Sequence, residues 1–275
     1  MTPPSTVREA IERVPGWEGE EVGTSALPGG TRNRSWLVNA PDGRFVLRLG
    51  GEAPAVGVDA SRELRVHHAA HDAGIAPAIR FADPGAGVLV TAYVDARRWH
   101  ADDLECPQNV RSVANLLRRV HALPPTGAMF EAADYARTYE SGLTLHAELR
   151  KDAALCASIV TSAPPPVSIR CCHNDVVAAN LLGDSPQLID WEYAADNDPY
   201  FDLASLIGYH DLPDSTANSL LSEYSGSTTA GHREQLSERR RVYDALQWLW
   251  LANRIADAPR AADADRLAAI RARLR

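Results

Sequence analysis

Short runs in which hydrophobic and polar residues alternate fill most of the N-terminal third of the chain, and turns rich in glycine and proline separate them. Alternation with a period of two residues predicts half-buried β-strands joined by tight turns. The expected strands are residues 21–27, 35–39, 44–49, 79–82 and 88–94. Residues 58–73 instead have hydrophobic side chains at helical spacing, and Gly74 follows at the position of a helix C-cap. We therefore expect an antiparallel sheet with one main helix.

The hydrophobic pattern changes to helical periodicity after residue 94. The expected helices are residues 102–121, 131–149, 152–162 and nearly the whole chain from 201 to 275. Three prolines at 164–166 end the third helix, and short strands are expected at 167–172 and 187–189. The predicted fold class is α+β, with a small β-rich lobe over residues 1–94 and a larger, mostly helical lobe over residues 95–275.

Composition limits the class of protein and its partners. The 275 residues carry a formal net charge of −8, which argues against nonspecific binding to nucleic acid or to an anionic membrane. No apolar run approaches the roughly 18–20 residues that span a bilayer, and residues 1–21 lack the apolar core of a signal peptide. The four cysteines show neither a CxxC pair nor zinc-like spacing, so we expect reduced thiols and a cytoplasmic protein. The sequence does not determine the oligomeric state.

Most of the candidate chemistry lies in one segment, residues 171–194, which reads CCHNDVVAANLLGDSPQLIDWEYA. Four residues separate Asp175 from Asn180, and Asp190 follows ten residues after Asn180. Kinase catalytic loops have this spacing between an aspartate that accepts a hydroxyl proton and an amide oxygen that holds a metal ion. A further carboxylate after the strand-like QLI adds the kind of oxygen ligand that Mg²⁺ prefers. The weaker alternative is a polar turn between two hairpin strands.

The same segment resembles a known family through two motifs, HNDVVAANLL and LIDWEYAADNDPYFDLA. These are similar to motifs of the choline/ethanolamine kinase family, within the wider aminoglycoside-phosphotransferase-like small-molecule kinases. Further similar segments follow the family's order: LPGGTRNRSWLV, FVLRLGG, SRELRVHHAAHDAGIAPAI and GVLVTAYVDAR. The resemblance covers residues 20–255 and implies a bilobal protein-kinase-like fold. It also implies an enzyme that uses ATP and Mg²⁺ to phosphorylate the hydroxyl group of a small alcohol, most simply choline, ethanolamine or a related amino alcohol.

The resemblance assigns roles to the residues of the central motif. It makes Asp175 the catalytic base, and it makes Asn180 and Asp190 the Mg²⁺ ligands. His173 is expected to hold the loop by hydrogen bonding and not to transfer a proton. Asp202 is expected either to assist a cation or to tie the loop to the helix that follows.

A second group of residues is expected to bind the nucleotide. It comprises Gly29, Gly30, Thr31, Asn33, Arg48, Glu63, Ala92 and Val94. The glycines let a hairpin backbone approach the ATP phosphates closely. Arg48 stands where protein kinases have a lysine, and Glu63 is its expected ion-pair partner. The carbonyl of Ala92 and the N–H of Val94 are the expected contacts to adenine.

The sequence determines the acceptor alcohol least. Choline kinases hold a quaternary ammonium group against aromatic rings, and the residues expected to contact the acceptor are Trp191, Glu192, Tyr243 and Trp250. The late helix departs from the family's W-x-x-W, because Leu249 alone separates Trp248 from Trp250, and its aromatic stripe also suits packing in a helical core. Val177 replaces a glutamine found in some choline kinases. Thiamine, an aminoglycoside or a natural-product alcohol are alternative acceptors, and a non-catalytic pseudokinase is the alternative class.

Overall fold

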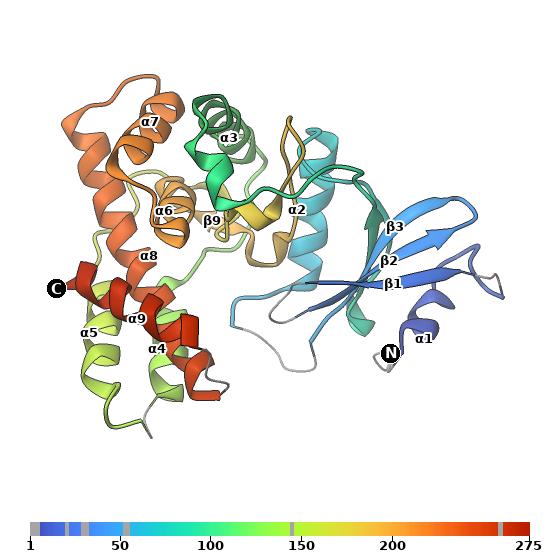
Figure 1. Ribbon diagram of the computed structural model, residues 1–275, viewed down its shortest axis with the longest axis horizontal. Helices are drawn as coiled ribbons and strands as arrows, with labels where there is room; N and C mark the ends of the chain where they lie inside the picture. The colour runs from blue at the N-terminus through green and yellow to red at the C-terminus, as the bar shows by residue number, and fades with distance from the viewer. Residues whose placement is uncertain (1–5, 20–21, 29–32, 52–55, 144–145, 258–260) are drawn as a thin grey trace. The chain divides into compact units, whose positions relative to one another are not determined.

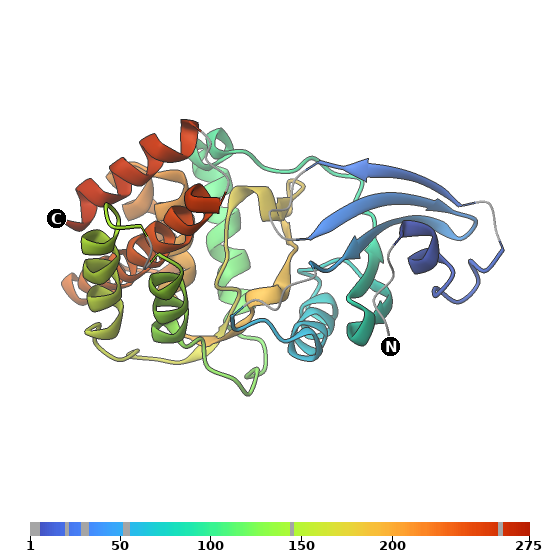
Figure 2. The same ribbon diagram turned by 90° about the horizontal axis from the view of Figure 1, so that it is seen from below.

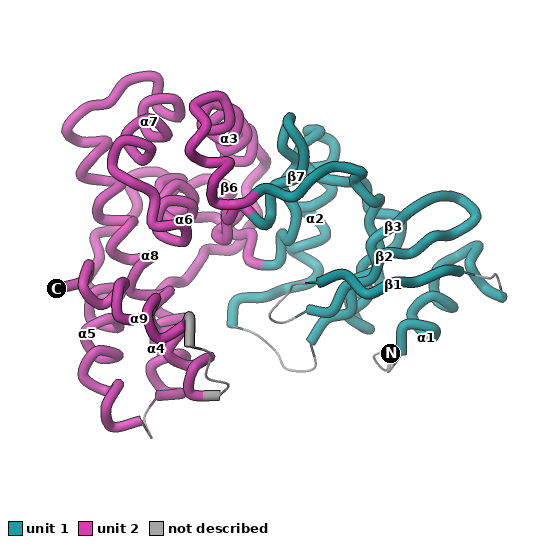
Figure 3. Tube along the Cα trace, viewed as in Figure 1, with its two compact units in different colours: residues 1–99, 179–192 teal, residues 100–178, 193–275 magenta. Residues whose placement is uncertain are grey.

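The computed structural model describes residues 6–19, 22–28, 33–51, 56–143, 146–257 and 261–275 (Figure 1). The chain divides into two compact units, coloured separately in Figure 3. Unit 1 comprises residues 1–99 and 179–192, and unit 2 comprises residues 100–178 and 193–275. The expected boundary near residue 94 left residues 179–192 in the C-terminal part, whereas the structure places this segment in unit 1.

The sheet of unit 1 contains the five strands expected from the alternating pattern. They are β1 (Gly23–Leu27), β2 (Arg34–Ala40), β3 (Gly43–Leu49), β4 (Ile79–Asp83) and β5 (Val88–Ala92). Their order in the sheet is β1-β2-β3-β5-β4, and every neighbouring pair is antiparallel. The predicted antiparallel sheet is therefore confirmed, with strand ends that differ by one or two residues.

Side-chain alternation along β3 gives the two faces of the sheet different roles. Phe45, Leu47 and Leu49 are buried in a hydrophobic core together with α1 (Val7–Ile11). Arg48 points to the opposite face, because successive side chains of a strand alternate, and there it contacts α2 (Ala60–Asp72). Figures 1 and 2 show the two helices beside the sheet. Arg48 of β3 and Glu63 of α2 thus form a charged pair on this face of the sheet.

Residues 179–192 form a small hairpin within unit 1, made of β7 (Leu181–Leu182) and β8 (Gln187–Leu188). Backbone hydrogen bonds attach both strands to the N-terminal segment. The N–H of Leu188 donates to the carbonyl of Ile75 at 2.8 Å, and the N–H of Trp99 donates to the carbonyl of Leu181 at 2.9 Å. These bonds place the DWE motif in unit 1.

Unit 2 is mostly helical, as the periodicity predicted. Its helices are η2 (Ala101–Glu105), α3 (Pro107–Val120), α4 (Ala132–Gly142), α5 (Arg150–Thr161), α6 (Tyr200–His210), α7 (Asp214–Ser225), α8 (Ala230–Asp257) and α9 (Ala261–Leu274). Two strands, β6 (Arg170–Cys172) and β9 (Ala195–Asn197), pair antiparallel. The helix expected over 102–121 is interrupted before Pro107, which starts a new helix at its first position. Within the described ranges, no helix combines the length and hydrophobicity of a membrane span.

Arginines of α9 attach this C-terminal helix to unit 2. Arg273 donates two hydrogen bonds, of 2.9 and 3.0 Å, to the buried carboxylate of Asp244 on α8. Arg271 forms a 2.8 Å salt bridge with Asp152 of α5, which is also buried. Figure 2 shows α9 beside α8. Much of the arginine-rich composition of residues 254–275 therefore serves the packing of this helix.

Candidate active site

The centre of the site in unit 1 is a charged group of three side chains from β3, α2 and the end of the hairpin. The Nη2 atom of Arg48 lies 2.6 and 2.7 Å from the two carboxylate oxygens of Glu63. Its Nη1 atom donates a hydrogen bond of 3.1 Å to Asp190. The predicted ion pair between Arg48 and Glu63 is confirmed, and the structure adds Asp190 to it.

The electrostatics of this group keep the arginine charged. Burial alone would lower the pKa of Arg48, but the negative charges of Glu63 and Asp190 outweigh burial and raise the pKa. The Nε atom of Arg48 is buried and has no hydrogen-bond partner among the described residues. The N–H at Nε is therefore not used in the contacts with the two carboxylates.

Asn180 and Asp190 lie at the same open end of the β7–β8 hairpin. The N–H of Ile189 donates to the carbonyl of Asn180 at 3.0 Å, so the residue before Asp190 is bonded to Asn180. Asp190 has a left-handed backbone with φ of 69°, and its side chain is 36% exposed. Asp190 thus offers a carboxylate that is open to solvent, and Asn180 at the same end of the hairpin offers a side-chain amide. These two groups fit Mg²⁺, which takes oxygen ligands and keeps waters and phosphate oxygens in its shell.

The remaining nucleotide contacts predicted from the sequence fall in three places. Gly29, Gly30 and Thr31 lie outside the described residues. Asn33 donates a hydrogen bond of 2.9 Å to the buried carboxylate of Glu192. Glu192, expected at the acceptor, is therefore bonded within unit 1 to a residue expected at the nucleotide.

The expected adenine contacts follow the central strands of the sheet. Ala92 is the last residue of β5, and its N–H donates to the carbonyl of Ala78 at 2.8 Å. Val94 comes two residues later, after Tyr93, whose N–H donates to the carbonyl of Arg44 at 3.0 Å. Tyr93 and Val94 thus continue the chain beyond β5, with Tyr93 bonded to β3. The contacts of Ala92 and Val94 to adenine stay a prediction.

In unit 2, the expected catalytic residue lies on the loop of residues 173–178, here called the Asp175 loop, which follows β6. The fully buried carboxylate of Asp202 on α6 accepts the N–H groups of His173 at 2.9 Å and Asn174 at 2.7 Å. His173 is itself fully buried, and its Nδ1 atom accepts the N–H of Asp175 at 3.3 Å. His173 holds the loop by hydrogen bonding, as expected, and of the two alternatives for Asp202 these bonds match the one that ties the loop to the helix. Asp175 itself is half-buried.

Asn174 fixes the turn that presents Asp175. Its φ is 65°, a left-handed conformation that asparagine adopts more readily than most residues. Its side-chain amide donates to the carbonyls of Tyr193 at 3.0 Å and Ala195 at 3.2 Å, and its oxygen accepts from Asn197 at 2.8 Å. The turn before Asp175 is therefore bonded to β9 as well as to α6.

A buried polar cluster supports Asp202 from behind. His121 lies with Nε2 3.0 Å from the Asp202 carboxylate and Nδ1 2.8 Å from the hydroxyl of Tyr224. Because a carboxylate only accepts, Nε2 carries the hydrogen in this bond. The sulfur of Cys172 lies in the same cluster, and His121, Cys172 and Asp202 are all buried. Their hydrogen bonds within the chain make the cluster a support for the loop.

Of the residues expected to contact the acceptor, Trp191 is a wrong prediction, and Tyr243 and Trp250 are partly covered by other side chains of the chain. Trp191 is fully buried and donates its indole N–H to the carbonyl of Leu188 at 3.0 Å, so it offers no surface to an acceptor. Tyr243 is also buried, with its ring 5.8 Å from that of Phe201. Trp250 is half-buried, and the guanidinium carbon of Arg254 lies 4.6 Å from its ring centroid. A cation of the chain itself thus occupies one face of Trp250.

Unit 2 contains an aromatic cluster that periodicity did not identify. Its members come from four segments and are Phe130, Tyr135, Tyr139, Tyr193, Phe201 and Tyr243. Rings of the cluster that neighbour each other in space have centroids 4.7 to 6.3 Å apart. Burial raises the pKa of Tyr243, and the charge of Asp175 raises it further. The carbonyl of Tyr193 accepts the side-chain amide of Asn174 at 3.0 Å, so the cluster adjoins the Asp175 loop. Phe130, Tyr139 and Tyr193 are its half-exposed members.

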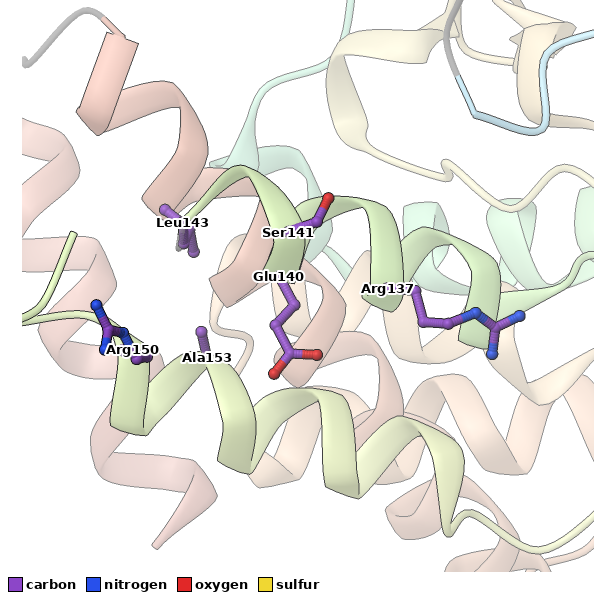
Figure 4. Close-up of a pocket in the computed structure, with 6 residues that line it drawn as sticks. All are labelled: Arg137, Glu140, Ser141, Leu143, Arg150 and Ala153. Carbon is purple, nitrogen blue, oxygen red and sulfur yellow. The ribbon is translucent and has the colours of Figure 1, made fainter. Parts of the chain in front are cut away.

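A surface hollow elsewhere in unit 2 is separate from these residues. It has a volume of about 480 Å³ and is lined by Arg137, Glu140, Ser141, Leu143, Arg150 and Ala153 of α4, α5 and the turn between them (Figure 4). None of the residues expected at the nucleotide, the metal or the acceptor lines it.

Comparisons with known proteins identify the family of the chain. Residues 23–238 match the family described as "Phosphotransferase enzyme family". Protein LicA of Haemophilus influenzae is 28% identical over 242 residues, which cover 81% of this chain and 70% of that protein.

Two solved structures share the fold. The choline kinase LicA from Streptococcus pneumoniae has a TM-score of 0.77 at 19% identity, with 98% of this chain and 97% of that chain covered. A structure of LicA in complex with AMP has a TM-score of 0.79 at 18% identity, with 97% of both chains covered. The predicted kinase-like fold is confirmed, and the chain belongs to the phosphotransferase enzyme family.

Proposed function

We propose that this small-molecule phosphotransferase transfers the γ-phosphoryl group of ATP to the hydroxyl of choline, ethanolamine or a related amino alcohol. Membership of the family supplies the reaction class. The phosphorus–oxygen bond to ADP breaks, a bond to the acceptor oxygen forms, and the hydroxyl proton leaves. We place the reaction in the cytoplasm, where ATP is available. The residues below carry the proposal.

Unit 1 supplies the groups for the nucleotide. Arg48 is charged and held on one side by Glu63, and a guanidinium group suits phosphate oxygens. Asn180 and Asp190 would hold Mg²⁺, and the ion would neutralise charge on the phosphates. Asn33 and the main chain of Ala92 and Val94 are the further contacts that we assign to ATP. The match to a LicA structure with AMP supports a nucleotide in this role.

Unit 2 supplies the groups for the acceptor. We assign the proton acceptor to the Asp175 carboxylate, which is half-buried on a loop held by Asp202. The adjoining aromatic cluster carries the preference for a cation, because an ammonium group is attracted to the faces of aromatic rings. The single observation that supports an amino alcohol best is this position of the cluster, given by the hydrogen bond of 3.0 Å from the side-chain amide of Asn174 in the Asp175 loop to the carbonyl of Tyr193.

The test is acceptor-dependent release of ADP by the purified protein with MgATP. The acceptors are choline, ethanolamine, thiamine, an aminoglycoside and 3,3-dimethylbutan-1-ol, which has the shape of choline without its charge. The proposal expects the highest kcat/KM for choline or ethanolamine and a value at least about tenfold lower for the neutral analogue. An equal rate with the neutral analogue, or a preference for the aminoglycoside, would contradict the assignment of the acceptor.

A further inference from the structure

Three side chains on one face of α6 hold four backbone N–H groups of the Asp175 loop. Asp202, Ser205 and His210 occupy positions i, i+3 and i+8, which share a helix face. Beyond the two N–H groups that Asp202 accepts, the hydroxyl oxygen of Ser205 accepts the N–H of Val176 at 3.1 Å. The Nε2 atom of His210 accepts the N–H of Ala178 at 2.9 Å. The helix therefore binds the loop on both sides of Asp175.

The contact of His210 requires a neutral imidazole. A backbone N–H only donates, so Nε2 must be the nitrogen without hydrogen. Burial, together with the nearby charge of Arg266, lowers the pKa of His210 to about 4. The acceptor nitrogen is thus available at neutral pH, with the hydrogen on Nδ1.

The C-terminal helix holds this end of α6 in place. Arg266 of α9 donates a hydrogen bond of 2.8 Å to the carbonyl of Tyr209, and its guanidinium carbon lies 4.1 Å from the Tyr209 ring centroid. The ring of Tyr209 in turn packs edge-on against His210, with centroids 4.9 Å apart. One cation therefore fixes the backbone before His210 and packs on the ring beside it.

We propose that His210 is a positioning residue for phosphoryl transfer, because it fastens the Ala178 peptide to α6 and thereby holds the Asp175 loop at its C-terminal end. It acts through the loop and does not touch the substrate. The inference rests on the proposed function, in which Asp175 accepts the proton and Asn180 holds the metal. Displacing reacting groups by about 1 Å can cost about 100-fold in rate, so the anchor should affect kcat.

The experiment compares His210→Ala, which removes the acceptor, with His210→Gln, whose side-chain oxygen can replace Nε2. His232→Ala is the matched control, since His232 also bonds a backbone group of unit 2, the carbonyl of Ser227 at 2.8 Å. We expect His210→Ala to lower kcat by about tenfold to 100-fold with KM for ATP changed less than about threefold. His210→Gln should recover most of that loss, and His232→Ala should match the unmodified protein. Equal losses in the Ala and Gln variants, or no loss in either, would overturn the proposal.

A second measurement does not depend on turnover. Amide hydrogen exchange at Ala178, followed by NMR, should be slow in the unmodified protein and in His210→Gln, and about tenfold faster in His210→Ala. Unchanged exchange in His210→Ala would overturn the anchor itself. If no acceptor supports turnover while the exchange result holds, the proposed function fails and the anchor stands. If turnover is present but exchange and kcat do not respond, only the role of His210 fails.

Discussion

The guanidinium of Arg48 donates a hydrogen bond of 3.1 Å to the carboxylate of Asp190, which lies 142 residues farther along the chain. The contact joins the residue assigned to the ATP phosphates with a residue assigned to the metal. Glu63 holds the other side of the guanidinium. A charged group arranged in this way predicts that changes at Arg48 affect both binding and folding.

Replacing Arg48 should separate these two effects. Arg48→Lys keeps a positive charge but has no planar fork with which to reach two carboxylates, so we expect KM for ATP to rise by about tenfold or more. Arg48→Met leaves Glu63, which is only 3% exposed, without its partner and should lower the free energy of unfolding by roughly 3–5 kcal/mol.

ATP titrations and urea unfolding provide the two measurements for Arg48. The control is Arg80→Met, because Arg80 pairs with Asp42 at the more exposed edge of unit 1 at 3.0 Å. We expect it to leave KM for ATP unchanged. An unchanged KM in Arg48→Lys would remove Arg48 from the nucleotide site.

A buried histidine predicts how stability depends on pH. Burial lowers the pKa of His67 to about 4, and its Nε2 donates to the carbonyl of Pro77 at 2.9 Å. Below its ordinary pKa of about 6.5 the unfolded chain binds a proton that the folded chain does not. The free energy of unfolding should therefore be highest above pH 6.5 and fall between pH 6.5 and 4.

The variant His67→Gln should flatten this dependence, because glutamine can keep the hydrogen bond but does not titrate. The difference in slope, integrated over the interval, should be on the order of 3 kcal/mol. Some slope should remain, because the pKa of His210 is lowered as well. His68→Gln, at the exposed neighbouring position, should leave the pH profile unchanged. Parallel profiles for the unmodified protein and His67→Gln would refute the assignment.

The aromatic cluster predicts a change in acceptor affinity at Tyr193, one of its half-exposed members. Tyr193→Leu keeps apolar bulk but removes the ring face, so KM for choline should rise by about tenfold. Tyr193→Phe keeps the ring and should stay within about twofold of the unmodified protein. Steady-state kinetics with choline and 3,3-dimethylbutan-1-ol check this, since the neutral alcohol should not distinguish Tyr193→Leu from Tyr193→Phe. A similar loss for both alcohols would point to a packing role for Tyr193.

The C-terminal helix predicts a cost in stability when its arginine is removed. Arg273→Gln leaves the buried carboxylate of Asp244 with a 3.6 Å salt bridge to Arg240 as its remaining ion pair among the described residues. We expect the free energy of unfolding to fall by about 1–3 kcal/mol, because a buried charge loses two hydrogen bonds. Arg111→Gln breaks the more exposed pair with Glu223 and should change stability by less than about 0.5 kcal/mol. Equal losses of unfolding free energy for Arg273→Gln and Arg111→Gln in urea titrations would contradict the larger role assigned to the buried pair.

Local pattern was sufficient to predict much of the fold. The two-residue alternation of β2 and β3 and the helical spacing of α2 come from contacts close in sequence, so their ends were predicted within about two residues. The ion pair of Arg48 with Glu63 could be predicted because the sequence pattern indicates both the strand and the helix that follows it. The family resemblance then assigned the two residues to each other.

Long-range contacts were not predictable in this way. Nothing local to residues 179–192 indicates that Leu188 bonds to Ile75 and that the hairpin belongs to unit 1. The full burial of Trp191 and the support that His210 gives to Ala178 likewise depend on tertiary packing. The position of Asn174 before Asp175 was a usable signal, since asparagine in a turn favours a left-handed backbone.

The most direct test of the central claim is transfer of ³²P from [γ-³²P]ATP to choline or ethanolamine by the unmodified protein and by Asp175→Asn. Asparagine has a similar size but cannot accept the hydroxyl proton, so transfer should fall by at least about 100-fold. Circular dichroism and binding of MgATP should be unchanged. Transfer to an amino alcohol that disappears in Asp175→Asn is the predicted result. Full transfer by Asp175→Asn, or no transfer by the unmodified protein to either alcohol, would contradict the account.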